Sequence, residues 1–457
     1  MKVLLVFCLM AAASASVRFP NLKKSPTEDK PLSQDVGEPL ILTPYLEANK
    51  TREAREAAQV NSEAFKNVSS YSGFLTVDKE NNGNLFFWFF KSEGNYEEDP
   101  VLVWLQGGPG GTSLYGLFVE IGPFGVTNGK VVSRDISWHK NHSVLYIDNP
   151  IGTGFSFTDG DYVTNQTQVG DHLYKFLTQF FTMFPEIQRN EFYVSGESYA
   201  GKYVPAIGYT IHKNNPTASV KINLKGLLIG NGLSDPKHQF KFGALLYQLG
   251  LIDKNAADLY ENYENLTSQS IDFENYEFAA YSWNQLIGTL FSKYTALPNI
   301  YDFVSDVDDS PTEWQDFVKT AEIRKALHVG NRTFNYQSDP VYESLSNDIP
   351  KSVAPWVSEL LSHYRILIFN GQLDIIVAYS STVNYLQNLN FSSSAEYAEA
   401  ERKIWSVSNR VAGYVKNAGN LTEVMVRDAG HMVPKDQPEA AYDLVYKFIR
   451  GQAIGVK

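Results

Sequence analysis

The sequence predicts an α/β fold with a mostly parallel central sheet that helices cover on both faces. Helix-length segments separate the predicted strands, and one of them, 166–184, carries phenylalanines at helical spacing, which is typical of a helix packed on a sheet. The predicted strands are apolar throughout rather than alternating, as strands buried on both faces are. The most apolar of these runs are 85–90, 101–105, 144–147, 226–229 and 365–369.

Five segments of different character divide the 457 residues. Residues 1–16 have a charged start, an apolar run and a small-residue end, which is typical of a secretory signal. Residues 17–66 are polar and rich in proline, so we expect an extended arm or a propeptide-like segment. Strand patterns are absent from 236–340, where Tyr, Asn, Glu and Ser dominate. We therefore expect a largely helical cap, inserted between two parts of an α/β core at 67–235 and 341–457.

The composition indicates an acidic protein that enters the secretory pathway. No later segment has about 20 consecutive apolar residues, so we expect no membrane anchor. The net charge of −12 is spread along the chain, which disfavours nucleic acid and anionic lipid as partners. Cys8 is the only cysteine and lies in the predicted signal, which leaves the mature chain without thiol chemistry or disulfides. We expect no metal or other cofactor, and either secretion or delivery to a lysosome-like acidic compartment.

Eight Asn-x-Ser/Thr sequons are spread along the chain, and in a chain with a signal peptide they predict N-linked glycans. Their asparagines are Asn49, Asn67, Asn141, Asn165, Asn265, Asn331, Asn390 and Asn420.

The stretch 196–201, Gly-Glu-Ser-Tyr-Ala-Gly, places a serine between a predicted strand and a predicted helix. Residues 192–195 form a short apolar run, and 203–212 have a helix-compatible pattern. A serine at such a corner projects its hydroxyl above the sheet, and the next backbone N–H is directed at an oxyanion. The usual signature is G-x-S-x-G, and Ala200 replaces its last glycine with another small residue. Ser198 is therefore a candidate nucleophile.

A serine nucleophile needs a base and a carboxylate that orients the base. In α/β hydrolases these residues follow in the order serine, acid, histidine, each after a strand. Of the histidines that follow Ser198, only His431 comes after a predicted strand (423–427) and a turn. Asp374 directly follows the preceding predicted strand and is the candidate acid. Asp428 is the local alternative, although its position three residues before the histidine is more typical of a turn residue.

A glycine-rich turn, W-L-Q-G-G-P-G-G at 104–111, follows another predicted strand. Such a turn exposes backbone N–H groups that can hold an anion or an oxyanion, and a purely structural turn is the alternative. Phosphate binding is disfavoured because no Gly-Lys-Ser/Thr follows. Residues 152–157 begin like a dinucleotide-binding fingerprint but lack its third glycine.

From about Tyr71 to the C-terminus the sequence resembles the serine carboxypeptidases, and within them the vitellogenic-carboxypeptidase-like and venom enzymes. Six ordered motifs carry the resemblance. They are W-L-x-G-G-P-G at 104–110, D-x-P-x-G-T-G-F-S at 148–156, G-E-S-Y-A-G-x-Y at 196–203, I-G-N-G-L-x-D-P at 229–236, G-x-x-D at 371–374 and G-H-M-V-P at 430–434.

The resemblance implies an α/β-hydrolase fold and a carboxypeptidase that acts through an acyl-enzyme. Ser198 would be the nucleophile, His431 the base and Asp374 its orienting acid. The backbone N–H groups of Gly108 and Tyr199 would form the oxyanion hole. The partners would be peptides or proteins with a free C-terminus.

The resemblance also implies a subsite for the substrate's terminal carboxylate. This chain departs from the family by having glutamine where asparagine is usual in that subsite, Gly111-Thr112 in place of Cys-Ser, and Val377 where a cysteine is common. The positions that match the subsite are Trp104, Gln106, Gly107, Glu120 and Glu197.

Glu197 adjoins the nucleophile, and the resemblance implies that it pairs with Glu120, which predicts a preference for acidic pH. Glu120, Glu197 and a substrate carboxylate cannot all be ionised cheaply in a small space, so at least one glutamate should hold a proton when substrate binds. The alternative is that Glu197 only packs or caps the elbow. Two other functions fit the same fold: a secreted esterase or lipase-type serine hydrolase, and a non-catalytic secreted protein.

Overall fold

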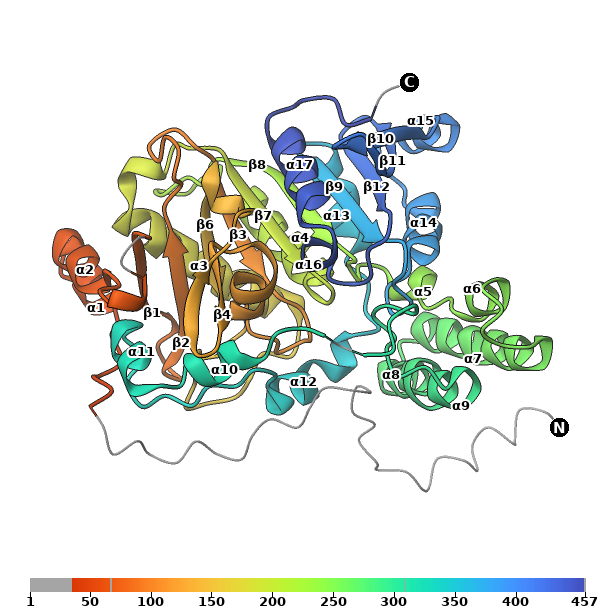
Figure 1. Cartoon of the computed structure of the whole chain (residues 1–457), viewed down its shortest axis with the longest axis horizontal. Helices are drawn as coiled ribbons and strands as arrows, with labels where there is room; N and C mark the ends of the chain where they lie inside the picture. The colour runs from red at the N-terminus through yellow and green to blue at the C-terminus, as the bar shows by residue number, and fades with distance from the viewer. Residues whose placement is uncertain (1–34, 66–67, 308, 456–457) are drawn as a thin grey trace.

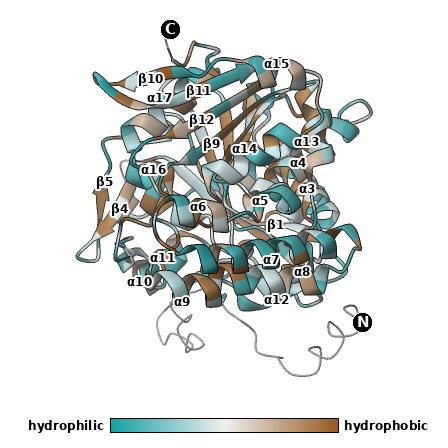
Figure 2. Cartoon of the chain, turned by 90° about the vertical axis from the view of Figure 1, so that its right-hand side faces the viewer, coloured by the Kyte–Doolittle hydropathy of each residue, from teal (hydrophilic) through white to brown (hydrophobic). Residues whose placement is uncertain are grey.

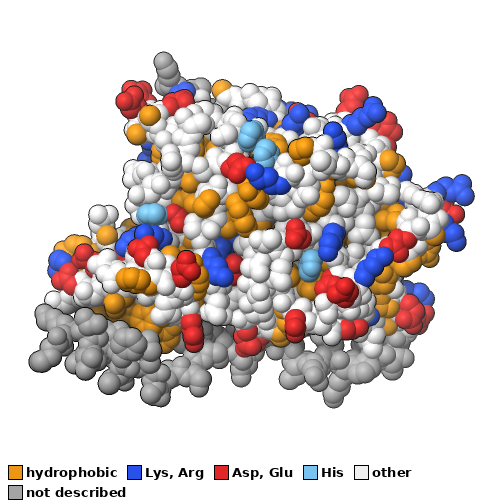
Figure 3. All heavy atoms as spheres, turned by 180° about the vertical axis from the view of Figure 1, so that it is seen from behind, with side chains coloured by type: hydrophobic (Ala, Val, Ile, Leu, Met, Phe, Trp, Pro, Cys, Tyr) orange, Lys and Arg blue, Asp and Glu red, His pale blue; other side chains and the backbone are white. Residues whose placement is uncertain are grey.

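The computed structural model describes residues 35–65, 68–307 and 309–455. The predicted signal, the first part of the predicted arm and the sequon at Asn67 lie outside these residues. Within the described ranges, no helix is both long enough and apolar enough to cross a membrane. Acidic and basic side chains are interspersed over the face shown in Figure 3, in agreement with the spread of charge along the sequence.

Ten strands form one sheet, and its central part is parallel (Figure 1). The parallel pairings join β6 to β3, β3 to β7, β7 to β8, β8 to β9 and β9 to β12. Both edges of the sheet are antiparallel. In spatial order the strands are β1 (Ser70–Asp78), β2 (Gly83–Phe90), β6 (Ser143–Ile147), β3 (Val101–Leu105), β7 (Phe192–Glu197), β8 (Leu224–Gly230), β9 (Arg365–Gly371), β12 (Leu421–Val426), β11 (Arg410–Ala418) and β10 (Lys403–Val407).

The apolar runs of the sequence are the strands of this sheet, and successive residues face two separate cores. In β3, Val101 and Val103 enter the core beneath α3 (Gln166–Met183) and α4 (Ala200–Asn214). Leu102 and Trp104 enter the core beneath α17 (Pro438–Ile449). The sheet is thus buried on both faces, and the predicted α/β architecture is confirmed.

The part of the predicted arm that the structure describes packs on the sheet edge at β1. It forms α1 (Thr43–Glu47), α2 (Thr51–Ala58) and a 3-10 turn (Glu63–Phe65), so it is not extended throughout. Leu42 is fully buried, and Ile41 forms a parallel bridge with Phe74. Arg55 makes a bidentate pair with Glu186 at 2.6 and 3.1 Å. The arm is helical here because α2 is amphipathic and buries its alanines.

The described residues of 236–340, the segment predicted as a cap, contain helices and isolated bridges but no strand. The first helices lie together at one end of the sheet (Figure 1), and α7 turns a largely hydrophilic face outward (Figure 2). α10 and α11 instead lie near the opposite edge, where Trp314 and Phe317 enter the same core as Trp104. The helices are α5 (Pro236–Gln239), α6 (Gly243–Gln248), α7 (Lys254–Asp272), α8 (Tyr276–Asn284), η6 (Gln285–Leu290), α9 (Phe291–Thr295), α10 (Glu313–Phe317) and α11 (Ala321–Ala326).

After the cap the chain returns to the core through two more helical segments before β9. α12 (Asp339–Leu345) is followed by a 3-10 turn, η7 (Ser346–Asp348), and α13 (Ala354–Leu361) then packs on α4. α14 (Tyr379–Asn388) and α15 (Ser394–Glu399) lie between β9 and β10.

Candidate active site

Ser198 occupies a sharp turn between β7 and α4. Its φ of +65° lies in the left-handed region, which residues other than glycine rarely adopt. The Ser198 N–H donates to Gly230 O at 3.0 Å, and the Ser198 carbonyl accepts from Gly201 at 2.9 Å. A Cβ on Gly201 would lie 2.6 Å from Leu233 N, so only glycine allows the loop after β8 to come this close. The sequence thus folds into the elbow that its motif predicts.

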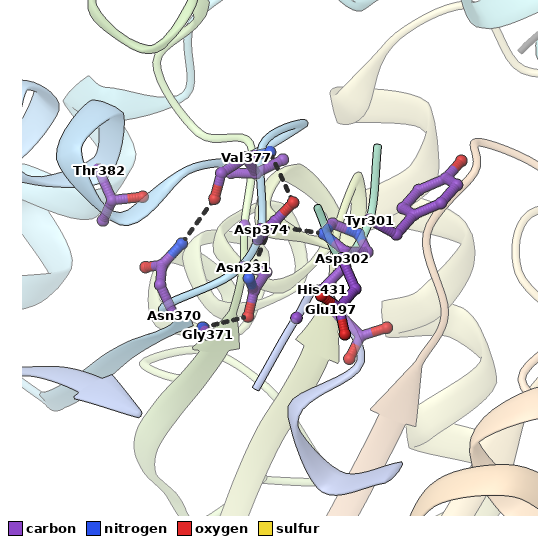
Figure 4. Close-up of polar contacts among 12 residues, drawn as sticks. Glu197, Asn231, Tyr301, Asp302, Asn370, Gly371, Asp374, Val377, Thr382 and His431 are labelled. Atoms are coloured by element: carbon purple, nitrogen blue, oxygen red, sulfur yellow. Dashed lines mark hydrogen bonds and ion pairs between the residues drawn. The ribbon is translucent and has the colours of Figure 1, made fainter. Parts of the chain in front are cut away.

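Asp374 and His431 come together from the loops that follow β9 and β12 (Figure 4). His431 Nδ1 lies 2.7 Å from Asp374 Oδ2, and both side chains are buried. His431 Nε2 is also buried and has no hydrogen-bond partner among the described residues. The imidazole is therefore oriented by a carboxylate through one nitrogen, and its other nitrogen is available to a reacting group. Asp428, the alternative acid, is exposed in the turn before His431.

Two residues that the sequence analysis did not single out support this pair. Asn231 is fully buried; its Nδ2 donates to Asp374 Oδ2 at 2.7 Å, and its Oδ1 accepts from the Gly371 N–H at 3.2 Å. Asn231 belongs to the motif at 229–236, which carried the family resemblance but no role. The carbonyl of Tyr301 accepts the His431 backbone N–H at 2.8 Å, and the two rings lie 5.3 Å apart (Figure 4). Tyr301 comes from the cap, where no sequence pattern marked it.

The glycine-rich turn after β3 lies against the elbow. A Cβ on Gly107 would be 2.6 Å from both Ser198 Cβ and Tyr199 N, so this close approach requires glycine. Gly108 has a φ of +115°. Among the described residues, neither the Gly108 nor the Tyr199 backbone N–H finds a hydrogen-bond acceptor. The structure therefore places two unsatisfied N–H groups on the residues that the sequence analysis assigned to the oxyanion hole.

A hydrogen-bonded chain runs from Trp104 to the residue before the serine. Trp104 Nε1 donates to Gln106 Oε1 at 2.8 Å, and Gln106 Nε2 donates to Glu197 Oε1 at 3.0 Å. The indole N–H of Trp104 is thus occupied by Gln106 and acts on the site through it. The longer glutamine, in place of the family's usual asparagine, reaches both neighbours.

Glu120 and Glu197 form a buried pair of adjacent carboxyl groups. Glu120 lies on the π-helical segment η3 (Gly116–Ile121), and both side chains are almost fully buried. Burial raises the pKa of Glu120 to about 7. Burial, and then the neighbouring Glu120, raise the pKa of Glu197 well above its usual value. Both Glu120 oxygens and Glu197 Oε2 lack a protein donor within the described part of the chain.

The described ranges hold no group of three or more His, Cys, Asp or Glu side chains that could ligate a metal ion.

Comparison with known proteins identifies the family. The model of the family described as serine carboxypeptidase matches residues 60–451. The chain belongs to the serine carboxypeptidase family. It is 48% identical to a venom serine carboxypeptidase of Apis mellifera over 430 residues, which cover 91% of each chain. It is 47% identical to a vitellogenic carboxypeptidase of Aedes aegypti, with 90% of each chain covered. The predicted family resemblance is confirmed.

A more distant human relative and a solved structure support the same family assignment. The human protein named probable serine carboxypeptidase CPVL is 42% identical, over 99% of this chain and 97% of its own. The crystal structure of Kex1Δp, described as a prohormone-processing carboxypeptidase from Saccharomyces cerevisiae, superposes with a TM-score of 0.75 and 28% identity. It covers 87% of this chain and 96% of its own. The carboxypeptidase is therefore a hydrolase of peptides or proteins with the predicted α/β-hydrolase fold.

The contact between Gly107 and the elbow makes a first prediction. Gly107→Ala should lower kcat/KM by about 10² or more, because the new methyl group would displace the Tyr199 N–H from the oxyanion position. Gly125→Ala is the matched control, since its Cβ would meet only ordinary contacts at 3.5 Å. Peptide hydrolysis by the two purified variants, with circular dichroism to check folding, measures the difference. Equal activity of the two variants would contradict the prediction.

Proposed function

We propose that this carboxypeptidase removes single residues from free peptide C-termini through an acyl-enzyme on Ser198. The observation that carries the proposal is the buried bond between His431 Nδ1 and Asp374 Oδ2 at 2.7 Å, which leaves His431 Nε2 unpartnered. An imidazole held in this tautomer can accept a proton at Nε2, and its positive charge is then stabilised by the carboxylate. Asn231, which donates to the same carboxylate, orients Asp374.

The residues of the site supply each step of acyl transfer. Ser198 Oγ attacks the scissile carbonyl carbon while His431 Nε2 takes the hydroxyl proton. The oxyanion is stabilised by the N–H groups of Gly108 and Tyr199. His431 then gives its proton to the leaving amine, the terminal amino acid departs, and an ester to Ser198 remains. Water, deprotonated by His431, hydrolyses this ester and regenerates the serine.

The carboxyl pair explains how the enzyme could select the last peptide bond. A substrate carboxylate close to the scissile bond needs hydrogen-bond donors and must not meet another charge. A protonated Glu120–Glu197 pair donates without adding charge, and Gln106 Nε2 and the Gly107 N–H are further donors at the same place. Trp104 orients Gln106, as its 2.8 Å bond to Gln106 Oε1 supports. Glu197 thus has a role in substrate binding rather than only in packing the elbow.

The export of the enzyme is part of the proposal. Residues 1–16 have the pattern of a secretory signal, and the Apis mellifera relative is named as a venom enzyme. Release from the cell and delivery to an acidic compartment both agree with a substrate site that contains a protonated carboxyl pair.

Ser198→Ala should abolish covalent labelling by a fluorophosphonate and lower turnover by about 10⁶. The physical reason is that the probe's phosphorus forms its bond to Ser198 Oγ. Gel fluorescence after incubation with the probe is the measurement. A labelled alanine variant would refute the assignment of the nucleophile, and an unlabelled wild type would support the non-catalytic alternative.

A blocked dipeptide with a free C-terminus should be cleaved far faster than its C-terminal amide. Loss of a charge-assisted hydrogen bond costs about 1.5–3 kcal/mol, so the ratio of kcat/KM should be at least about 10. Chromatography measures how fast the terminal amino acid is released from the one substrate and its amide from the other, and the two rates give the ratio. Equal cleavage of acid and amide would overturn the terminal-carboxylate subsite, and cleavage of fatty-acyl esters alone would identify a lipase-type hydrolase.

The KM for peptides should rise as pH increases through about 7, the pKa to which burial raises Glu120. Below that pH both carboxyl groups of the pair are protonated, and above it Glu120 becomes a negative charge that faces the substrate carboxylate. Glu120→Gln removes the group that ionises near pH 7, and burial still raises the pKa of Glu197, so the KM of this variant should be nearly constant from about pH 5 to about pH 8. An unchanged pH dependence of KM in Glu120→Gln would exclude the shared proton.

Glycosidase treatment of enzyme from an insect or mammalian host should lower its apparent mass. Asn141 and Asn165 are partly buried, and the exposed Asn420 donates its amide to Leu361 O at 2.9 Å. Glycans should therefore occupy mainly the exposed sequons at Asn49, Asn265, Asn331 and Asn390. Replacing these four asparagines with glutamine should remove most of the mass shift, and a wild type without a shift would contradict export by this route.

A further inference from the structure

A buried charged network surrounds the side chain of Tyr199, the residue that follows the nucleophile. Tyr199 Oη donates to Asp348 Oδ2 at 2.6 Å. Gln166 Nε2 donates to the same Asp348 oxygen at 2.7 Å and to Tyr199 Oη at 3.1 Å. Tyr199 is 3% exposed, and its ring meets Tyr203 edge-on at 5.2 Å. The phenol is thus held at its far end by two hydrogen bonds and along its face by packing.

Lys202 holds the carboxylate at the centre of this network. Its ammonium lies 3.1 Å from Asp348 Oδ2 and also donates to the carbonyls of Asp348 and Ile349. The relative exposure of Lys202 is 0% and that of Asp348 is 2%. A buried ion pair adds little net stability, because the loss of hydration offsets the attraction. Stability alone therefore gives little reason for a charged pair at this place.

The network joins three segments that are distant in sequence. Tyr199 and Lys202 begin the elbow helix α4, and Gln166 is the first residue of α3. Asp348 ends η7, the turn on which the chain returns from the cap to the core. No step of the proposed mechanism uses Asp348, Lys202 or Gln166, yet all three act on the residue whose N–H faces the oxyanion.

We propose that Asp348 is a positioning residue that aims the Tyr199 N–H at the oxyanion. The backbone of Tyr199 has φ −59° and ψ −20°. A rotation that swings its N–H away from the oxyanion also swings the phenol, and the bond to Asp348, fixed by Lys202, opposes that movement. Oxyanion stabilisation depends on donors held within a few tenths of an ångström of their place. The inference rests on the proposed function only in taking Ser198 as the nucleophile and Tyr199 N–H as an oxyanion donor.

The decisive comparison is between two tyrosines of the same strand-helix unit. Tyr199→Phe removes the bond to Asp348 and keeps the ring. Tyr193→Phe is the matched control, because Tyr193 is also fully buried and its hydroxyl contacts Glu191 and Arg365 at 2.9 Å. Tyr193 lies near the opposite end of β7 from Ser198. Each variant removes the hydrogen bonds of a buried tyrosine to charged side chains, and only the bond of Tyr199 lies beside the oxyanion hole.

The rate of inactivation by a fluorophosphonate is the first readout, because its adduct places an oxygen in the oxyanion hole and needs no peptide recognition. Tyr199→Phe should lower the second-order rate constant by about three- to tenfold, and Tyr193→Phe by less than about twofold. Equal rates for Tyr199→Phe and wild type, or equal losses in the two variants, would overturn the proposal. A wild type that reacts with the probe but cleaves no peptide would instead refute the proposed function.

Peptide kinetics give a second readout that a purely structural role would not produce. In Tyr199→Phe, kcat should fall by the same factor as the inactivation rate, while KM stays within about twofold of wild type. A peptide with a reduced scissile bond places no oxygen in the hole, so its inhibition constant should not change. A parallel loss of affinity for this peptide would show general disorder of the site and would contradict positioning.

A double substitution tests Asp348 itself without leaving an unpaired buried charge. Lys202→Met with Asp348→Ala removes both charges and the acceptor of the Tyr199 hydroxyl. Its inactivation rate should fall as far as that of Tyr199→Phe, and adding Tyr199→Phe should lower it no further, because both changes break one interaction. Losses that multiply would show that Asp348 does not act through Tyr199. If the double variant does not fold, the comparison of Tyr199→Phe with Tyr193→Phe decides.

Discussion

The left-handed turn at Ser198 is the constraint on which the rest of the site depends. Ser198 has a φ of +65° at a corner where two neighbouring segments come close. The glycine-rich turn after β3 approaches at Gly107, and the loop after β8 approaches at Gly201; a Cβ at either glycine would lie 2.6 Å from another residue's backbone. The parallel order β3–β7–β8–β9–β12 then brings the loops of the nucleophile, acid and base to one edge of the sheet.

The loops at this edge are held by non-covalent contacts, because the described residues contain no cysteine. The last residues of the segment 236–340 hold the glycine-rich turn in place: Ser338 N donates to Gly110 O at 2.9 Å, and Gln337 Nε2 donates to Pro109 O at 2.6 Å. These contacts lie beside Gly111, where the family resemblance implies a cysteine. A large core on both faces of the sheet can therefore stabilise the site in place of disulfides.

The site contains buried carboxyl groups in two different surroundings. Asp374 is buried and lies within hydrogen-bond distance of His431 Nδ1, Asn231 Nδ2 and the Val377 N–H. Burial raises the pKa of both Glu120 and Glu197, and the neighbouring Glu120 raises the pKa of Glu197 further. One carboxylate can thus orient a base while its neighbours donate a hydrogen bond to an anion.

The sequence by itself determined the α/β architecture, the elbow at Ser198, the loop positions of Asp374 and His431, and the family. These follow from local signals: apolar runs, short glycine motifs and their order along the chain. Only the tertiary structure decided that Asn231 supports Asp374 and that Trp104 acts through Gln106. It also decided that the arm forms α1 and α2 and buries Leu42, Ala54 and Ala58, and that Asp348 contacts Tyr199 from 149 residues away. Such contacts carry no local pattern, because an asparagine or an aspartate in a loop has the same sequence surroundings whether it faces water or a catalytic group. Tyr301 likewise has no local sequence pattern that marks it. Its role became visible only in the fold, where it lies against His431.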